Sequence, residues 1–278
     1  MRSKILLKKM SGVLSLLMII TAIYAQEQRS STGFSPQVGQ RGKDVVWVPT
    51  PQDLVDKMLE MAKVTSSDFV IDLGSGDGRT VITAAKLGAK ARGIEYNPDM
   101  VQLSKENAEK AGVTDRAEFV QEDLYKADLS KATVITMFLL PEINLKLRPT
   151  LLDLKPGTRI VSNTFTMGDW EEDYKVTTDE NWNSWNTAYM WIIPAKVDGN
   201  WKFENGELQL KQEYQKFIGT DKVGGKFMNV TDGKLLGDEI TFMLNNEKFT
   251  GKVNGNSMKG TVTNSSSGTK RDWSATRN

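Results

Sequence analysis

The chain has 278 residues, 39% hydrophobic and 26% charged, a globular composition that allows one large domain or two modest ones. It contains neither cysteine nor histidine, which excludes disulfides, thiolate nucleophiles, imidazole bases and metal sites built on these two residues. The net charge of +1 gives no support for broad nucleic-acid binding. Catalysis must therefore use carboxylates, lysines, tyrosines, backbone groups or a cofactor.

The chain begins with a basic segment and continues with an apolar one. Four basic side chains among the first nine residues precede an apolar run from Val13 to Ala25. This pattern predicts a secretory signal peptide over residues 1–25, with an uncleaved membrane anchor or a merely apolar tail as alternatives. A signal peptide or a membrane anchor would leave the rest of the chain outside the cytoplasm. The chain would then lie in the periplasm or cell envelope, or be anchored to a membrane. Residues 26–44, rich in Ser, Gln and Gly, are predicted to be a linker.

A first helix is predicted after a short proline-containing segment. Thr50 is expected to be its N-cap and Pro51 its first residue. Apolar side chains from Gln52 to Ala62 recur at helical spacing and share one face.

The stretch V-I-D-L-G-S-G-D-G-R, from Val70 to Arg79, organises the first part of the chain. An apolar run ends in an acid, glycines follow at every second position, and an Ala-rich segment from Thr80 to Leu87 predicts a helix. Strand, glycine turn and helix together are typical of a nucleotide-binding α/β unit. A plain surface turn is the alternative.

Strands and helices alternate from residue 68 to residue 163. Asn97 is the expected N-cap of a helix that runs to about Ala111, and Gly112 ends it. Further strands are predicted at Ala89–Ile94, Glu118–Val120, Thr133–Leu140, Thr158–Ser162, Tyr174–Thr178 and Thr187–Ile193, and a further helix at Pro141–Leu154. This alternation predicts a doubly wound, Rossmann-like sheet.

Acidic residues follow the first three predicted strands. Asp72, Glu95 and Asp123 meet at the ligand crevice of such a sheet, and Glu95 has the spacing of a ribose-binding acid. Asp72 lies immediately before the glycine turn and Asp77 inside it, which is poorly suited to a pyrophosphate, and the glycine spacing is G-x-G-x-G rather than G-x-G-x-x-G. A ligand with an ammonium group and no phosphate, such as S-adenosylmethionine, fits better. A solvated loop carboxylate is the alternative for each acid.

These motifs resemble the class I S-adenosylmethionine-dependent methyltransferases over roughly Val46 to Trp170. D-L-G-S-G-D-G-R resembles the first motif of the family, G-I-E-Y-N-P-D the second-strand motif, and Q-E-D-L the third. W-V-P-T-P, F-L-L-P-E and K-P-G-T-R-I-V-S-N resemble a subgroup that includes membrane-anchored protein lysine methyltransferases and bacterial relatives of unassigned substrate. The resemblance implies a methyltransferase domain over residues 45–194.

The resemblance also implies a set of cofactor-binding residues. Asp72, Gly74 and Gly76 would line the methionine end, Glu95 the ribose, and Asp123 with Leu124 the adenine. The whole expected set is Trp47, Pro49, Thr50, Asp72, Gly74, Ser75, Gly76, Asp77, Glu95, Tyr96, Asp123, Leu124 and Met137. No metal site is predicted.

Phe138, Leu139 and Glu142 are the expected catalytic residues. Met137, Phe138, Leu139 and Pro141 replace the Asn/Asp-Pro-Pro-Tyr element of enzymes that methylate nucleic-acid amines, so no nucleic-acid acceptor is expected. The sequence predicts methyl transfer to a protein lysine or another small amine. Phe138, Leu139 and Trp47 would desolvate that amine and Glu142 orient it. Glu142 alternatively only begins a helix.

Two other functions remain open from the sequence. An exported, non-catalytic binding protein would keep the fold and use its C-terminal part for interaction. A nicotinamide-dependent oxidoreductase is disfavoured by Asp72 and by the glycine spacing.

Residues 195–278 change in composition and predict a small antiparallel β domain, a meander or barrel-like sheet. Asn-Gly and Asp-Gly pairs separate short alternating runs, as in successive hairpins. Phe249-x-Gly251-x-Val253 and Met258-x-Gly260-x-Val262 form a degenerate repeat. The aromatic residues expected in its core are Trp201, Phe203, Tyr214, Phe217, Phe227, Phe242 and Trp273. The tryptophans just before this domain, Trp170, Trp182, Trp185 and Trp191, are expected to pack on the sheet edge rather than to line a substrate site.

Overall fold

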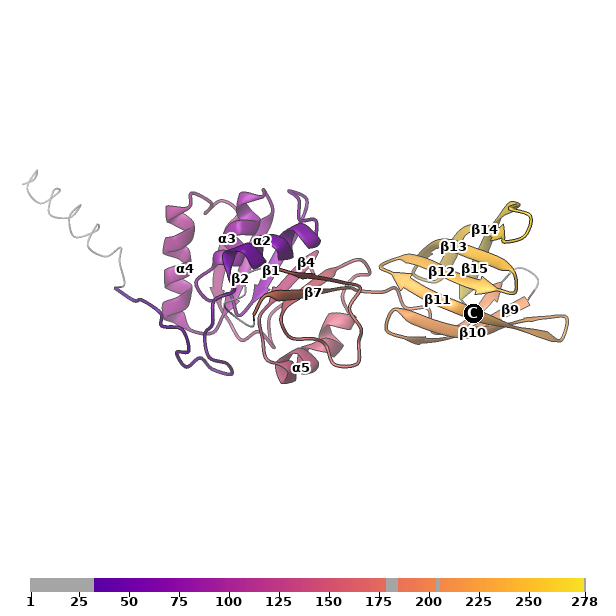
Figure 1. Cartoon of the computed structure of the whole chain (residues 1–278), viewed down its shortest axis with the longest axis horizontal. Helices are drawn as coiled ribbons and strands as arrows, with labels where there is room; N and C mark the ends of the chain where they lie inside the picture. Colours follow the sequence, from indigo (N-terminus) through magenta and orange to yellow (C-terminus); the bar gives the residue numbers. More distant parts are fainter. Residues whose placement is uncertain (1–32, 179–184, 204–205, 278) are drawn as a thin grey trace, which may run out of the picture.

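The computed structural model describes residues 33–178, 185–203 and 206–277, which form an α/β body and a β-barrel (Figure 1). Residues 1–25, expected to be a signal peptide or anchor, and Trp182 lie outside the described residues. Among the helices that are described, none has the length and apolar character needed to cross a membrane. Export of the chain therefore stays a prediction from sequence.

In the described residues, seven strands form one mixed sheet. Their order across it is β3 (Ala117–Gln121), β2 (Lys90–Glu95), β1 (Phe69–Leu73), β4 (Val134–Met137), β5 (Arg159–Asn163), β7 (Thr187–Ile192) and β6 (Tyr174–Thr177). The first five of these are parallel, whereas β7 runs antiparallel to both β5 and β6. The predicted Rossmann-like sheet is confirmed, but it is mixed, because β6 and β7 are joined too closely for a crossover helix.

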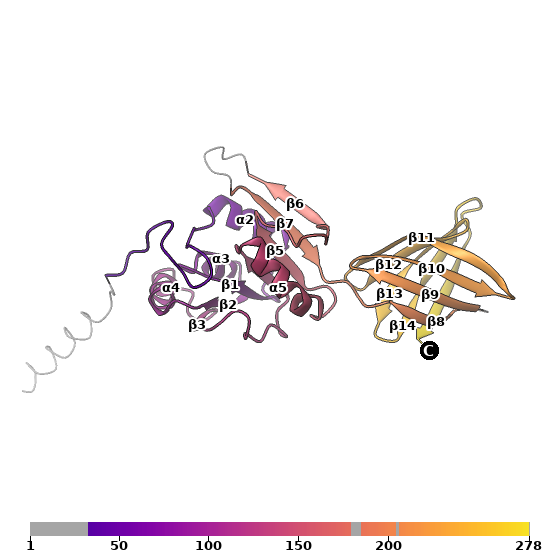
Figure 2. The same ribbon diagram turned by 90° about the horizontal axis from the view of Figure 1, so that it is seen from below.

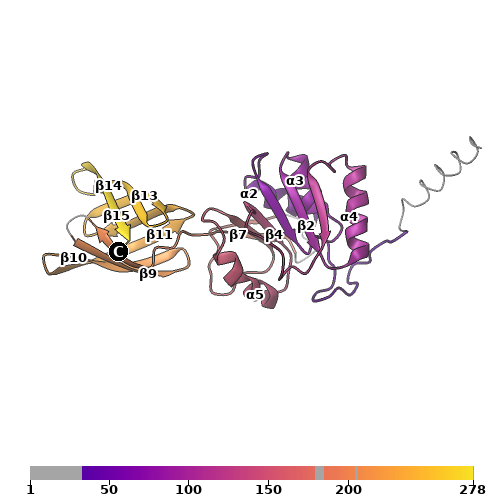
Figure 3. The same ribbon diagram turned by 180° about the vertical axis from the view of Figure 1, so that it is seen from behind.

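Helices cover both faces of this sheet. The helices α2 (Gln52–Met61), α3 (Arg79–Lys86) and α4 (Pro98–Lys110) pack on one face, and α5 (Pro141–Leu152) lies on the other (Figure 3). Neighbouring residues of β1 point to opposite faces, so Val70 joins the core cluster of the first three helices while Ile71 joins that of α5. The carboxyl ends of the parallel strands are left open between these layers.

Two predicted boundaries are corrected by the structure. β4 ends at Met137 rather than Leu140. Pro51, not Thr50, is the N-cap of α2, because the Thr50 hydroxyl accepts a 3.2 Å hydrogen bond from Asn163 Nδ2 instead of capping the helix. By contrast, the Asn97 side chain does accept a bond from Asp99 N–H at the start of α4, as expected.

Eight strands among the described residues close into an antiparallel barrel. In chain order they are β8 (Gly199–Phe203), β9 (Gly206–Glu213), β10 (Lys216–Val223), β11 (Lys226–Leu236), β12 (Glu239–Leu244), β13 (Glu247–Asn254), β14 (Ser257–Asn264) and β15 (Lys270–Arg277). The barrel closes where β15 pairs with β8. The two halves of the degenerate repeat lie on β13 and β14, where Gly251 pairs with Gly260; a Cβ on Gly260 would lie 1.9 Å from the Thr250 carbonyl oxygen.

Aromatic side chains fill the barrel interior. Five of the seven predicted core aromatics are buried there: Trp201, Phe203, Phe217, Phe242 and Trp273. The prediction was wrong for Phe227, which is 65% exposed, because it lies in the hairpin at the start of β11 and points outward. It was also wrong for Tyr214, whose ring stacks on Trp170 of the α/β body, with centroids 5.8 Å apart.

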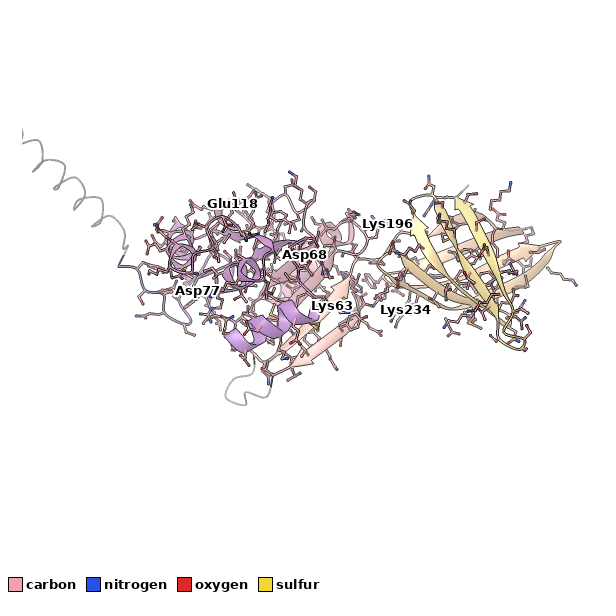
Figure 4. All side chains as sticks on the ribbon, turned by 90° about the horizontal axis from the view of Figure 1, so that it is seen from above. Lys63, Asp68, Asp77, Glu118, Lys196 and Lys234 are labelled. Atoms are coloured by element: carbon pink, nitrogen blue, oxygen red, sulfur yellow. The ribbon has the colours of Figure 1, made fainter. Side chains whose placement is uncertain are left out.

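The barrel is attached at the amino end of β5. A Cβ on Gly237 of the barrel would lie 3.1 Å from the Cα of Gly157, two residues before β5 begins. Gln215 donates a 2.8 Å hydrogen bond to the Glu171 carbonyl, and Lys196 pairs with Asp153. Figure 4 shows Lys196 and Lys234 on the side of the barrel that faces the α/β body, and Asp68 closer to the barrel than Asp77.

Candidate active site

The carboxyl ends of β1 to β5 border a cavity of about 500 Å³. Fifteen of the sixteen residues predicted for the site line it: Trp47, Pro49, Thr50, Asp72, Gly74, Ser75, Gly76, Asp77, Glu95, Tyr96, Asp123, Leu124, Met137, Phe138 and Leu139. Glu142 is not among the lining residues. It is exposed in the first turn of α5, where an acid favours the helix dipole.

The glycine turn after β1 is held against the end of β2. Gly74 and Ser75 donate their N–H groups to the Ile94 carbonyl at 2.8 and 3.1 Å, and Gly76 N–H donates to Glu95 Oε2 at 3.0 Å. Gly76 has φ +54°, and a Cβ there would lie 2.6 Å from Trp47 Nε1. The glycine therefore allows both the turn and the close approach of the indole.

Glu95 links the turn to the start of α4. Its Oε1 accepts a 2.9 Å bond from Asn97 N–H while Oε2 accepts from Gly76. Each carboxylate oxygen has a second lone pair, so the carboxylate can also accept bonds from two ligand hydroxyls. The backbone contacts fix its orientation before any ligand arrives.

Asp72 is a buried acid at the end of β1. Its Oδ1 accepts a 2.6 Å bond from the Thr136 hydroxyl, and among the described residues no basic group pairs with it. The pKa of Asp72 is raised to about 7. Burial is the largest cause and the charges of Asp77 and Glu95 add to it, whereas the Thr136 bond acts in the opposite direction. A cationic ligand would compensate this buried negative charge.

Asp77 and Ser75 line the cavity with different side-chain environments: Asp77 is ion-paired, whereas the buried Ser75 hydroxyl has no hydrogen-bond partner among the described residues. Asp77 forms a 2.6 Å ion pair with Arg79, whose Nη1 donates a 2.8 Å bond to the Thr50 carbonyl. The Ser75 hydroxyl packs over β2, where a Cβ on Gly93 would lie 2.5 Å from it. Both residues belong to the turn. Among the acids that line the cavity, Asp72, Glu95 and Glu122 form no ion pair with the described residues.

A segment before α2 covers the other end of the cavity. We call residues 37–47 the strap; Gly39 N–H donates to the Trp47 carbonyl, and Trp47 N–H donates to that of Gln40. Figure 2 shows this indigo segment at the end of the α/β body away from the barrel. Lys43 of the strap lies 2.9 Å from Asp123, whose other oxygen accepts from Tyr125 N–H. These two bonds hold the pKa of Asp123 below its usual value.

Lys43 is a site residue that sequence reasoning missed. It falls in the segment predicted to be a linker, and no local pattern marks it. The structure makes that part of the predicted linker a wall of the cavity.

The ends of β4 and β5 supply aromatic rings to the cavity. Phe138 lies 6.0 Å from Phe165 and 5.6 Å from Trp185, and the last two lie 5.9 Å apart, measured between ring centroids. All three rings are half-buried and line the cavity. Phe165 was missed, although its place just after a parallel strand was a usable signal. Trp185, expected to pack on the sheet edge, lines this site instead, whereas Trp170 and Trp191 are buried as expected.

Comparison with known proteins gives matches over the α/β part of the chain. Residues 72–174 match the family described as the ANTKMT methyltransferase domain. A protein-lysine N-methyltransferase of Saccharolobus islandicus is 46% identical over 152 residues, which cover 54% of this chain and 94% of that protein. The adenine nucleotide translocase lysine N-methyltransferase of Mus musculus is 36% identical over 104 residues; the match spans 37% of this chain and 45% of the mouse protein.

The solved structures that match include one with high sequence identity. The crystal structure of an RNA methyltransferase from Salinibacter ruber in complex with S-adenosyl-L-homocysteine is 49% identical, with a TM-score of 0.51. The match covers 54% of this chain and 96% of that one.

Proposed function

Because the chain belongs to the class I S-adenosylmethionine-dependent methyltransferases, in the ANTKMT group of protein-lysine methyltransferases, we propose that it methylates a lysine side chain of a protein. The observation that carries this proposal is the order of groups along one cavity. Asp123 follows β3, Glu95 ends β2 and Asp72 lies in β1, and an apolar, aromatic wall follows at β4 and β5.

The residues present fit S-adenosylmethionine along the first three strands. Asp123 can accept a hydrogen bond from the adenine amine, Glu95 from the ribose hydroxyls, and the buried Asp72 can balance the positive charge of the methionine end. Gly74 lets the turn pack closely against Leu139, since a Cβ at Gly74 would lie 3.3 Å from Leu139 Cδ2. The bound cofactor supplies an electrophilic methyl group on a sulfonium.

Methyl transfer is an in-line displacement in which the lysine Nζ lone pair attacks the methyl carbon. The carbon–sulfur bond breaks, its electron pair stays on sulfur, and the product is S-adenosylhomocysteine with a methylated amine. The lysine must first lose a proton to water, and desolvation among Phe138, Leu139 and Trp47 favours its neutral form. Positioning rather than a strong base then supplies most of the acceleration. The exposed Glu142 lies outside the cavity lining, so its role as an orienting acid stays a prediction.

RNA is the second candidate acceptor, because the similar Salinibacter ruber structure is titled an RNA methyltransferase. Lysine is favoured by the sequence Phe138 to Pro141. That segment has no Asn or Asp side chain to accept a hydrogen bond from a base amine.

The test uses total protein and total RNA from cells that lack the gene, incubated with purified enzyme and S-adenosylmethionine labelled in its methyl group. We expect label in protein and, after acid hydrolysis, in methyl-lysine. Asp72→Ala and Glu95→Ala should abolish transfer, and Phe227→Ala, an exposed barrel position, should not. Label only in RNA contradicts the lysine proposal, and calorimetry showing no binding of S-adenosylmethionine contradicts it at the first step.

A further inference from the structure

We infer that Phe138, Phe165 and Trp185 form the channel through which the acceptor lysine reaches the methyl group, and that Ser162 and Asn144 are positioning residues for it. We call the three rings the aromatic channel. The inference rests on the proposed function and adds the acceptor subsite to it.

The place of the rings follows from the strand order. Adenine, ribose and methionine groups take up the crevice over β3, β2 and β1, so the methyl group faces β4 and β5. Leu139 bridges the two regions, because its Cδ2 lies 3.3 Å from the position of a Cβ on Gly74. Phe138, the chain neighbour of Leu139, also lines the cavity, and Phe165 follows the adjacent strand β5.

The three rings are not core residues. Aromatic residues that serve as core in this chain are almost completely covered; Phe242 and Phe249, for example, are 0% and 1% exposed. Phe138, Phe165 and Trp185 are half-buried, contact one another and face the same cavity. Their exposed faces are therefore available to a ligand.

Buried polar groups hold Phe165 in place. The Ser162 hydroxyl donates a 2.7 Å bond to the Phe165 carbonyl, and Asn144 Nδ2 donates to the same carbonyl at 3.3 Å and to that of Thr166 at 3.2 Å. Ser162 and Asn144 are both 0% exposed. These buried side chains therefore fix the backbone at Phe165, and with it the origin of the Phe165 ring.

Backbone strain at Thr164 points to the same purpose. Thr164 has φ +62°, in the left-handed region that β-branched residues rarely adopt. Such strain persists where the surrounding structure enforces it, and it clusters at ligand sites. Here it turns the chain sharply after β5, so that Phe165 follows directly at the cavity wall.

The chemistry of the aromatic channel suits an unbranched primary amine. Ring walls remove water from the ammonium and favour the neutral, nucleophilic amine. After transfer, the same ring faces attract the methylated ammonium product. A flexible alkyl chain between such walls is a better occupant than a polar, planar base whose ring nitrogens would lose their hydrogen bonds.

The experiment compares Phe165→Ala and Trp185→Ala with wild type, using protein from cells that lack the gene as acceptor and methyl-lysine as the readout. We expect kcat/KM for the acceptor to fall by about tenfold or more, with the Kd for S-adenosylmethionine within about twofold of wild type. Phe165→Tyr, which keeps the ring, should retain most activity. Ser162→Ala should raise the acceptor KM and leave kcat unchanged.

Phe227→Ala is the control, and it matches Phe165→Ala most closely because it removes the same ring from an exposed site on the barrel. Alanine variants that match this control in acceptor kcat/KM overturn the aromatic channel and leave the proposed function standing. Loss of cofactor affinity in step with activity overturns it as well. Wild-type enzyme that binds S-adenosylmethionine and produces no methyl-lysine overturns the proposed function, and the channel with it.

Discussion

The Nζ atom of Lys43 lies 2.9 Å from Oδ2 of Asp123, and the same ammonium lies 4.7 Å from the centroid of the Tyr96 ring. The pair joins the strap to the end of β3, where the adenine of the cofactor is expected. Lys43 therefore competes with the adenine amine of the cofactor for the Asp123 carboxylate. The strap and the ligand are therefore coupled through one acid.

We predict that Lys43→Ala speeds both binding and release of S-adenosylmethionine, because the strap loses its contact with Asp123. The Kd should change by less than about fivefold, since the ion pair is solvent-accessible and screened. Stopped-flow binding at low and high salt measures this. Lys57→Ala, which breaks the 2.8 Å surface pair with Glu60, is the control and should leave both rates unchanged. Rates of binding and release in Lys43→Ala that equal those of wild type would show that the strap does not control access of the cofactor.

The raised pKa of Asp72 predicts that cofactor affinity depends on pH. The cationic ligand binds the ionised acid, so below pH 7 the affinity should fall by about tenfold per pH unit as Asp72 takes up a proton. Calorimetry between pH 5.5 and 7.5 measures the slope. Asp72→Asn should bind weakly with a flat profile, and a flat profile in wild type would contradict the prediction.

The same group predicts an unusual stability profile for the ligand-free protein. The pKa of Asp72 is about 7 in the folded state and near its ordinary value of 3.8 when unfolded, so between these values the folded state binds more protons. The Asp72 contribution to the free energy of unfolding therefore falls as pH rises from about 4 to about 7 and is level above that. Asp72→Asn should be more stable than wild type at pH 8 and equal to it below pH 4 in urea denaturation.

Gly76→Ala tests the contact between the glycine turn and Trp47. The new Cβ would lie 2.6 Å from the indole nitrogen at φ +54°, so Trp47 or the turn must move, and we expect at least about tenfold weaker cofactor binding. Gly224→Ala is a close control. It has φ +55° with no atom within 4 Å of the added Cβ, so it imposes the same backbone strain without the clash. Equal cofactor affinity in the two variants would show that the contact is unimportant.

Asp68 lies at the amino end of β1, the end of the strand away from the cavity. We expect its substitution to change the stability of the fold and not cofactor binding. Asp68 is 7% exposed, pairs with Arg159, and accepts 2.8 Å bonds from Thr133 Oγ1 and Thr65 N–H. Burial raises its pKa, but these bonds outweigh it and the net pKa is lowered. Asp68→Asn should lose about 2 kcal/mol of the free energy of unfolding at pH 7.

The pH dependence of that loss has a definite sign. A lowered pKa stabilises the fold above the unfolded value, and this stabilisation is lost as pH falls below about 4 through the folded value. Urea denaturation at pH 7 and pH 3.5 should therefore show a difference between Asp68→Asn and wild type that shrinks in acid. A change in cofactor Kd for this variant would contradict a purely structural role.

Local patterns were sufficient to predict the parallel strands and the acids that follow them. Asp72, Glu95 and Asp123 were found because the carboxyl ends of parallel strands lie on one edge whatever the rest of the chain does. The N-cap at Asn97 could also be predicted, because a helix cap depends only on residues that are adjacent in the sequence.

Contacts between distant segments could not be predicted in this way. Thr50 has the sequence of an N-cap, but its hydroxyl accepts a bond from Asn163, 113 residues further along the chain. Lys43 and Trp185 reach the cavity from segments whose local sequence shows neither a strand nor a motif. Hairpin patterns in the sequence indicated which consecutive strands of the barrel are neighbours. They could not indicate that the last strand, β15, pairs with the first, β8, and so closes the barrel.

The close approach of Gly237 to Gly157 joins the barrel to the α/β body at a point far from the cavity. It lies at the amino end of β5, and five residues of strand at about 3.3 Å each separate that end from the cavity by roughly 17 Å. Mutations on the outer barrel surface thus reach no group that handles the methyl donor. We therefore expect substitutions on that surface to leave the affinity for the methyl donor unchanged, provided that the small residues at the junction are kept.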